Sequence, residues 1–208
     1  MYEVFGYPVQ ALASQLLLGL VNGSFYALLS LGLAIIFGML GIVNFAHGVM
    51  FMIGAHVAYM ASSLLGLNYW AALLLAPVIV GALAIVVEQT LLRRLYKIDP
   101  LYNMLLTFGL AMVAEGLFRQ FFGVSGHSVS VPSQLQGATN LGFMVMPIYR
   151  VWVILASITV CLATWYAVEK TRFGSVLRAG TENPVLTQAF GINVPRIVMW
   201  TYGGGAAL

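Results

Sequence analysis

The stretch Trp70-Ala-Ala-Leu-Leu-Leu-Ala-Pro-Val-Ile-Val80 is apolar at every position, so any regular backbone would be apolar on all faces. It lies within a longer run, 4–87, that contains no Asp, Glu, Lys or Arg. One helical crossing of a bilayer takes about 20 residues, so this run has room for three crossings. Strands of a membrane β-barrel would alternate apolar and polar residues, and this stretch does not. The stretch therefore predicts transmembrane α-helices.

The composition of the whole chain supports the same class. Among 208 residues there are nine Lys or Arg and six Asp or Glu, and 61% of the residues are hydrophobic. An average soluble domain is about 25% charged, so this chain cannot cover itself with a polar shell. A soluble enzyme, a nucleic-acid-binding module and a disordered segment are excluded. The predicted fold class is all-α, a polytopic transmembrane helical bundle.

Six apolar segments are the predicted spans. They cover 11–37, 49–65, 69–92, 101–122, 149–168 and 194–208. The sixth is shorter than a comfortable crossing, and no polar tail follows it. We therefore expect 1–208 to be one transmembrane domain that is incomplete at its C-terminus.

The distribution of basic residues predicts the orientation. Seven of the nine basic residues fall between the third and fourth or the fifth and sixth segments: Arg93, Arg94, Lys97, Lys170, Arg172, Arg178 and Arg196. Lys and Arg accumulate on the cytoplasmic side of membrane proteins. We therefore expect 169–196 to be a cytoplasmic loop, with 123–148 and the N-terminus outside. Alternation at Val129 and Val131 predicts a short strand pair in the outer loop.

One polar motif, Gly41-Ile-Val-Asn-Phe-Ala-His-Gly48, interrupts the first two apolar segments. Broken backbone at membrane depth is tolerated only where protein or a water-lined cavity satisfies its polar groups. Asn44 and His47 are therefore candidates for hydrogen bonds to a solute or to the opened backbone. The alternative is that both residues merely cap helix ends in a polar turn.

Two further sets of charged residues fall within or beside apolar segments. Glu115 and Arg119 are four residues apart, in the order that favours an ion pair on one helix face. We interpret them as a structural ion pair. Glu88 lies near the cytoplasmic edge and is interpreted as a partner of Arg93 or Arg94 rather than a proton carrier.

The cytoplasmic loop contains the signals of a short helix. Asn183-Pro184 fits an N-cap followed by proline at the first helical position, and Gly191 fits the C-terminal cap. Pro195 then prevents the helix from continuing. Val185, Leu186, Ala189 and Phe190 give this helix an apolar face. From spacing alone, that face packs either on its own bundle or on a partner protein.

Motifs for chemistry are missing from the sequence. No paired nucleophile and base, no zinc-type spacing of His47, His56 and His127, and no G-x-x-x-x-G-K-[ST] phosphate loop occurs. A lone Cys161 fits packing in an apolar run. We predict no catalytic residue, no bound metal and no ATP hydrolysis by this chain.

Several motifs, taken in order, resemble a known family. They are Val21-Asn-Gly-Ser-Phe-Tyr-Ala-Leu28, the Gly41–Gly48 motif above, Leu106-Thr-Phe-Gly109, Thr171-Arg-Phe-Gly174, Arg178-Ala179, Glu182-Asn-Pro184 and Gly191-Ile-Asn193. Together they resemble the permease subunit of branched-chain amino-acid ABC importers, of the LivH type. The resemblance covers essentially the whole chain, although permeases of this family are normally longer.

The resemblance implies a transport subunit without catalytic chemistry or a cofactor of its own. Its implied partners are a second permease, two cytoplasmic ATPases that use ATP and an extracytoplasmic solute-binding protein, with no nucleic acid. The implied location is the bacterial or archaeal cytoplasmic (inner) membrane.

The resemblance also assigns roles to particular residues. Residues implied to contact the ATPase are Arg178, Glu182, Asn183, Pro184, Leu186, Phe190 and Gly191. Path candidates are Asn22, Asn44 and His47. The solute stays open, because a similar permease for urea, short amides or another small solute is an alternative. An ATP-independent channel or secondary transporter is the alternative from another class.

Overall fold

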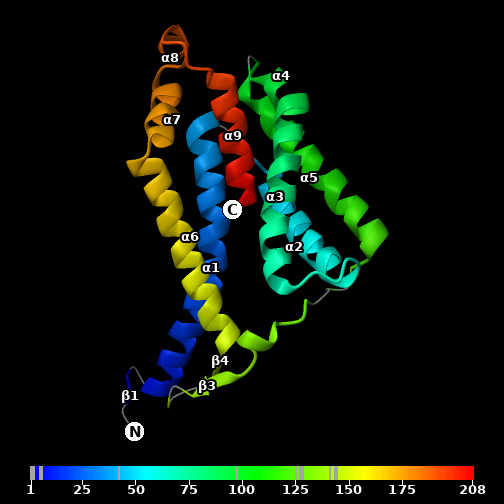
Figure 1. Ribbon diagram of the computed structural model, residues 1–208, viewed down its shortest axis with the longest axis vertical. Helices are drawn as coiled ribbons and strands as arrows, with labels where there is room; N and C mark the ends of the chain where they lie inside the picture. Colours follow the sequence, from blue (N-terminus) through cyan, green and yellow to red (C-terminus); the bar gives the residue numbers. More distant parts are fainter. Residues whose placement is uncertain are drawn as a thin grey trace. The chain divides into compact units, whose positions relative to one another are not determined.

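The computed structural model describes residues 3–4, 7–41, 43–96, 98–124, 126, 129–140, 142 and 145–208. Most of them are helical (Figure 1). The helices are α1 (Val9–Leu40), α2 (His47–Ser63), α3 (Tyr69–Val87), α4 (Arg93–Leu95), α5 (Pro100–Phe122), α6 (Ile148–Lys170), α7 (Arg172–Glu182), α8 (Pro184–Ala189) and α9 (Val194–Ala207). A π-helical turn, Glu88–Leu92, joins α3 to α4, and Ser133–Leu135 is a 3-10 turn.

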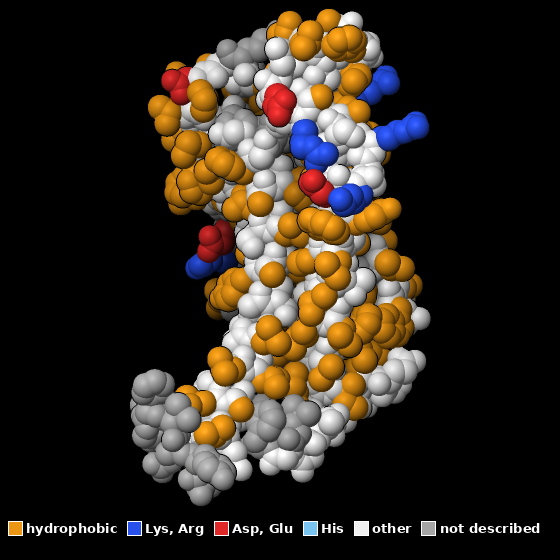
Figure 2. Space-filling model, turned by 90° about the vertical axis from the view of Figure 1, so that its left-hand side faces the viewer, with side chains coloured by type: hydrophobic (Ala, Val, Ile, Leu, Met, Phe, Trp, Pro, Cys, Tyr) orange, Lys and Arg blue, Asp and Glu red, His pale blue; other side chains and the backbone are white. Residues whose placement is uncertain are grey.

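Each predicted apolar segment coincides with a helix, so the all-α prediction is confirmed. Four helical stretches are long and apolar enough to cross a membrane: Val9–Gly38, Tyr69–Leu95, Pro100–Phe122 and Ile148–Lys170. Large apolar side chains on them stay exposed, as Leu16 at 77% and Leu74 at 73% illustrate. Figure 2 shows apolar side chains along the helices of one face, where Lys and Arg gather mainly toward one end. Such a surface suits lipid rather than water.

The chain divides into two compact units, each described here by itself. The first comprises 1–28 and 130–165, and the second comprises 29–129 and 166–208. In the first unit, β3 (Ala138–Asn140) pairs antiparallel with β4 (Val145–Pro147), with Thr139 opposite Met146. The two-residue strands β1 (Glu3–Val4) and β2 (Tyr7–Pro8) also pair antiparallel.

The predicted position of the outer strand pair was wrong. Neither Val129 nor Val131 lies in a strand; the 3-10 turn follows Val131, and the strands come later in the loop. The Val131 carbonyl instead accepts a hydrogen bond from Gln136 Nε2 at 2.8 Å. Alternation over three residues was too short to distinguish a strand from a loop.

The second unit is built around α9, which packs closely on α3, while α3 packs on α2 (Figure 1). Its core cluster comprises Ile36, Met50, Val80, Ala84, Leu92, Tyr202 and Ala206. Glycines bring the backbones together, because a Cβ at Gly205 would lie 2.7 Å from Ile36 Cγ1 and 2.9 Å from the Gly32 carbonyl oxygen. A Cβ at Gly32 would overlap the Gly205 carbonyl oxygen in turn. Close helix approach at small residues is typical of membrane bundles.

Candidate functional site

The break between α1 and α2 is formed by a short turn in the second unit. Gly41 follows α1 with a positive φ of 64°, a conformation that glycine adopts without strain. The Asn44 Oδ1 atom then accepts a hydrogen bond from the Ala46 backbone N–H at 3.1 Å. The His47 N–H donates to the Asn44 carbonyl oxygen at 3.2 Å. Asn44 therefore organises the turn that starts α2, as asparagine commonly does.

Hydrogen bonds connect the same turn to two helices that are distant in sequence, α9 and α5. Asn44 is 5% exposed, and its Nδ2 donates to the Tyr202 hydroxyl of α9 at 2.9 Å. The Phe45 N–H donates to Thr107 Oγ1 of α5 at 3.3 Å, and the Phe45 and Phe108 rings meet edge to face. Both side-chain amide atoms of Asn44 are thus committed to protein partners. The backbone N–H groups of Phe45, Ala46 and His47 thus all have protein partners, which suits backbone placed at membrane depth.

His47, the first residue of α2, is also buried, at 6% exposed. Its Nε2 lies 2.9 Å from the Leu29 carbonyl oxygen, and its ring touches the surface of α1 that Gly32 leaves open. The structure therefore brings His47 and Asn44 to one turn. Asn22 belongs to the first unit, where it is exposed on α1.

Glu88 differs from the sequence interpretation. It was expected to be a partner of Arg93 or Arg94; no close ion pair joins them in the described part of the chain, although the charge of Arg93 acts on Glu88 electrostatically. Glu88 is fully buried at 0% exposed, and its Oε1 accepts from the Tyr96 hydroxyl at 3.2 Å. Glu88 and Leu92 follow the buried Val80 and Ala84 of α3 at a spacing of four residues, so they continue the buried face of that helix through the π-helical turn. Burial raises the pKa of the Tyr96 hydroxyl, which therefore remains a hydrogen-bond donor.

Glu115 and Arg119 lie side by side on α5. Arg119 Nη2 is 2.6 Å from Glu115 Oε1, and both side chains are more than half exposed. They border a hollow of about 470 Å³ with Met52, His56, Phe118, Gly123 and Val124. The His56 ring lies 4.6 Å from the Phe118 ring. An exposed pair of this kind contributes little to stability, about 0–1 kcal/mol.

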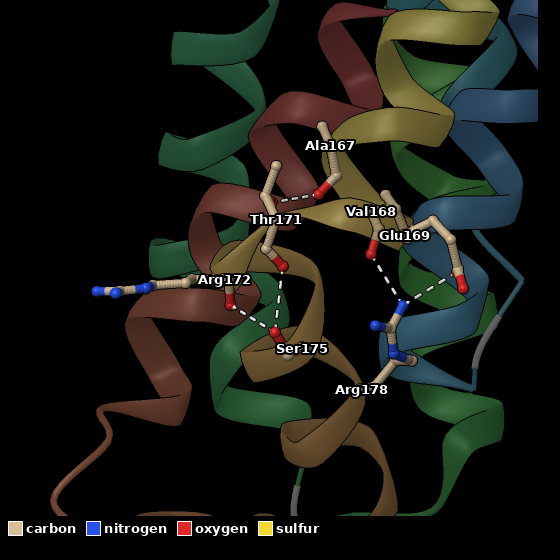
Figure 3. Close-up of polar contacts among 7 residues, drawn as sticks. All are labelled: Ala167, Val168, Glu169, Thr171, Arg172, Ser175 and Arg178. Carbon is tan, nitrogen blue, oxygen red and sulfur yellow. Dashed lines mark hydrogen bonds and ion pairs between the residues drawn. The ribbon is translucent and has the colours of Figure 1, made fainter.

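The corner between α6 and α7 is fixed by the chain itself (Figure 3). Arg178 of α7 points back to the end of α6, where its Nη1 donates to the Val168 carbonyl oxygen at 2.9 Å and lies 3.2 Å from Glu169 Oε2. The Thr171 hydroxyl donates to the Ala167 carbonyl oxygen. A Cβ at Gly174 would overlap the Val168 carbonyl, so the corner requires glycine there. Sequence analysis placed Arg178 in the loop but missed both its partners and the helix α7.

Helix α8 has the predicted caps. Asn183 Oδ1 accepts from the Leu186 N–H at 2.9 Å, Pro184 is the first helical residue, and Gly191 has a φ of 82°. Thr187 is buried and donates through its hydroxyl to the Ala179 carbonyl oxygen of α7 at 2.8 Å. These bonds hold α8 at a fixed place at the end of α7.

The other face of α8 is apolar and uncovered. Val185 is 79% exposed, Leu186 is 55% exposed, and Phe190, just after the helix, is 77% exposed. Glu182 at the end of α7 is exposed as well. Helix α8 lies outside the four stretches that are long and apolar enough to cross a membrane, so lipid does not account for these exposed apolar side chains.

Several long apolar helices, a break between α1 and α2 and a capped helix outside the spans are the features of a multi-pass membrane protein. A family described as "Branched-chain amino acid transport system / permease component" matches residues 15–208. The chain belongs to this family of ABC-transporter permeases.

Three relatives place the chain more closely. It is 26% identical to the high-affinity branched-chain amino acid transport system permease protein BraD of Pseudomonas aeruginosa, over 93% of this chain and 67% of the relative. It is 28% identical to the permease protein LivH of Escherichia coli, over the whole chain and 70% of the relative. It is 28% identical to the probable branched-chain amino acid transport permease protein LivH of Methanocaldococcus jannaschii, over 90% of this chain and 61% of the relative. No solved structure gave a significant match.

Family membership settles the general class. The protein is a multi-pass membrane permease, a transport subunit and not an enzyme, and subunits of this kind bind no cofactor directly. Permeases of ABC transporters work with ATPase and solute-binding partners, which the family implies for this chain.

Proposed function

We propose that this chain forms half of a translocation path for branched-chain or other hydrophobic amino acids, together with a second permease. Two cytoplasmic ATPases drive the transport, and an extracytoplasmic binding protein delivers the amino acid. The proposed membrane is the bacterial or archaeal inner membrane, with the N-terminus outside. The branched-chain amino acid transport named for the relatives supports the solute class, and the clustering of seven basic residues supports the orientation.

The proposed coupling of this permease to its ATPases rests on the uncovered apolar face of α8. Asn183, Thr187 and Gly191 fix the helix, while Leu186 and Phe190 stay exposed. Because these bonds hold α8 firmly, movement of a partner bound to its outer face is transmitted to α7 and α9 and does not deform α8. We propose that this apolar face binds in a groove of an ATPase subunit. Arg178 and Glu182 belong to the same coupling segment, and Arg178 acts by positioning α7.

Asn44 and His47 line the path, in this proposal, by holding the broken backbone in shape. Their hydrogen bonds to Tyr202 and to the Leu29 carbonyl support that role. Asn22 remains a candidate on the exposed side of α1. An importer that changes conformation with ATP needs an element with two stable arrangements. The turn between α1 and α2 is suited to this role because a single hydrogen bond connects it to α9.

Substitution within α8 tests the coupling role. Leu186→Asp within α8 should abolish amino-acid uptake by the reconstituted transporter while the ATPases still hydrolyse ATP, because the apolar contact is lost. Gly191→Asp, just after α8, should have the same effect because Asp is strained at the positive φ of this cap and adds a charge beside the apolar face. Glu115→Gln, on an exposed pair away from α8, is the matched control and should transport normally. Uptake at the wild-type rate in both α8 variants would contradict the assignment.

The loop 123–148 is the proposed docking site for the binding protein. Its strand pair β3–β4 lies in the first unit and presents exposed residues on Ala138–Asn140. Adding acidic residues to that strand should abolish uptake without changing basal ATP hydrolysis. Normal uptake by the variant with acidic residues on β3 would contradict the proposed docking site.

A further inference from the structure

One face of α1 is polar from position 15 to position 26, a part of this helix that belongs to the first unit. Positions 15, 19, 22, 23 and 26 have the spacing that places residues on one side of an α-helix. They are occupied by Gln15, Gly19, Asn22, Gly23 and Tyr26, so no aliphatic side chain lies on this face. The face covers roughly 17 Å of helix within the candidate span Val9–Gly38.

The other sides of α1 differ from this polar face. Val21 and Ser24 are buried, so their side of the helix packs on protein. Leu16 and Leu20, on an adjoining side, are exposed apolar residues that suit contact with lipid. The five residues of the polar face are all exposed as well. Exposed polar groups and exposed leucines therefore occupy separate sides of the same helix.

Hydrocarbon is an unfavourable neighbour for the polar face. The side chains of Gln15 and Asn22 make no hydrogen bond among the described residues, and lipid tails offer none. Polar side chains within membrane helices instead face a water-filled cavity or the interior of a bundle. A Cβ added at Gly19 or Gly23 would meet no atom within 4 Å. The middle of the face is therefore free of side chains, which leaves width for a solute.

The polar groups of this face are uncharged. No Asp, Glu, Lys or Arg occurs in 4–87, so the polarity comes from the amides of Gln15 and Asn22 and the hydroxyl of Tyr26. Each of these groups both donates and accepts hydrogen bonds. An amino-acid zwitterion offers an ammonium donor and a carboxylate acceptor, which such groups match. Because no fixed charge holds either end, the solute binds weakly enough to leave, as conduction requires.

We propose that the polar face of α1 lines a water-filled translocation path and forms hydrogen bonds with the ammonium and carboxylate groups of the transported amino acid. This inference rests on the proposed function and adds the residues that contact the solute: Gln15, Asn22 and Tyr26. The groups they contact are common to all α-amino acids. The polar face therefore accepts the main-chain part of the solute and does not select among side chains.

Cysteine labelling tests whether the polar face meets water. Cys161 is the sole cysteine of the chain, so Cys161→Ala provides a thiol-free permease. In that background, Asn22→Cys and Gln15→Cys place a thiol on the polar face, and Leu20→Cys places one on the leucine side as the matched control. The assembled permease and ATPase complex in nanodiscs, with and without ATP, is treated with sulfonatoethyl methanethiosulfonate, an anionic reagent that does not enter lipid. Mass spectrometry of the permease measures the reaction.

The reagent reacts with thiolates, which form in water and not in hydrocarbon. We expect both polar-face thiols to react at least about tenfold faster than the Leu20→Cys thiol in one of the two conditions. Labelled Asn22→Cys should then lose leucine uptake in proteoliposomes, whereas treated Leu20→Cys should retain it. If Asn22→Cys does not assemble, Gln15→Cys carries both measurements.

Labelling of the polar-face thiols no faster than Leu20→Cys in both conditions overturns the inference, because the face then packs on another helix. Full leucine uptake by the completely labelled polar-face variant overturns the contact with solute. The proposed function is tested separately by leucine uptake of the unlabelled Cys161→Ala transporter. Fast labelling without such uptake supports the water-lined face and contradicts an amino acid as its solute.

Discussion

Asn44 and Tyr202, 158 positions apart in the sequence, share a buried hydrogen bond of 2.9 Å from Asn44 Nδ2 to the Tyr202 hydroxyl. Asn44 shapes the break between α1 and α2, and Tyr202 lies on α9, which begins just after the coupling segment. Helix α9 also contacts α7 and α8 directly. The bond therefore joins the proposed ATPase-binding region to the broken part of the bundle through one rigid helix.

The first prediction concerns this bond. Tyr202→Phe removes the hydroxyl and leaves the buried Asn44 amide without its acceptor, which should lower the free energy of unfolding by about 1–3 kcal/mol. Tyr166→Phe is the matched control, since Tyr166 is 60% exposed on α6. Thermal unfolding of the purified transporter compares the two. Equal stability of both variants would mean that the bond contributes nothing.

A second prediction uses neighbouring glycines of α9. Gly205→Ala places a methyl group against Ile36 and the Gly32 carbonyl, and should destabilise the second unit by about 1–3 kcal/mol. Gly204→Ala meets no atom within 4 Å and should be neutral or slightly stabilising, because alanine favours helix. The measurement is the Tm of each single variant. The prediction fails if Gly204→Ala is the more harmful change.

Much of this fold could be predicted because its causes are local. Composition decides where helices lie in lipid, and Asn183, Pro184 and Gly191 predict α8 because capping depends on neighbouring residues. The burial of Glu88 was missed although Glu88 lies four residues after the buried Ala84, because a carboxyl group is rarely found in an apolar core. Likewise, nothing near Asn44 in the sequence indicates Tyr202. Such pairs depend on how distant helices pack.

A third prediction concerns the α6–α7 corner. Gly174→Ala should prevent the corner from forming, since its methyl group would overlap the Val168 carbonyl. With α7 displaced, α8 no longer presents its apolar face correctly, and we expect the ATPases to be lost during purification of the complex. Gly116→Ala on α5, with no atom within 4 Å of the added Cβ, is the control. Retention of the ATPases by Gly174→Ala would show that the corner tolerates displacement.

The last prediction separates folding of α8 from its partner contact. Thr187 faces inward and bonds the Ala179 carbonyl, while Phe190 is 77% exposed. Thr187→Val should lower the free energy of unfolding by about 1 kcal/mol, because one buried hydrogen bond is lost. Phe190→Ser should leave the Tm of the isolated permease unchanged, since it buries nothing there, yet weaken ATPase binding at least tenfold if Phe190 is an anchor of that contact. Pull-down of the ATPases at graded concentrations measures the binding. A fall in Tm with Phe190→Ser, or normal ATPase binding, would place Phe190 outside the docking surface.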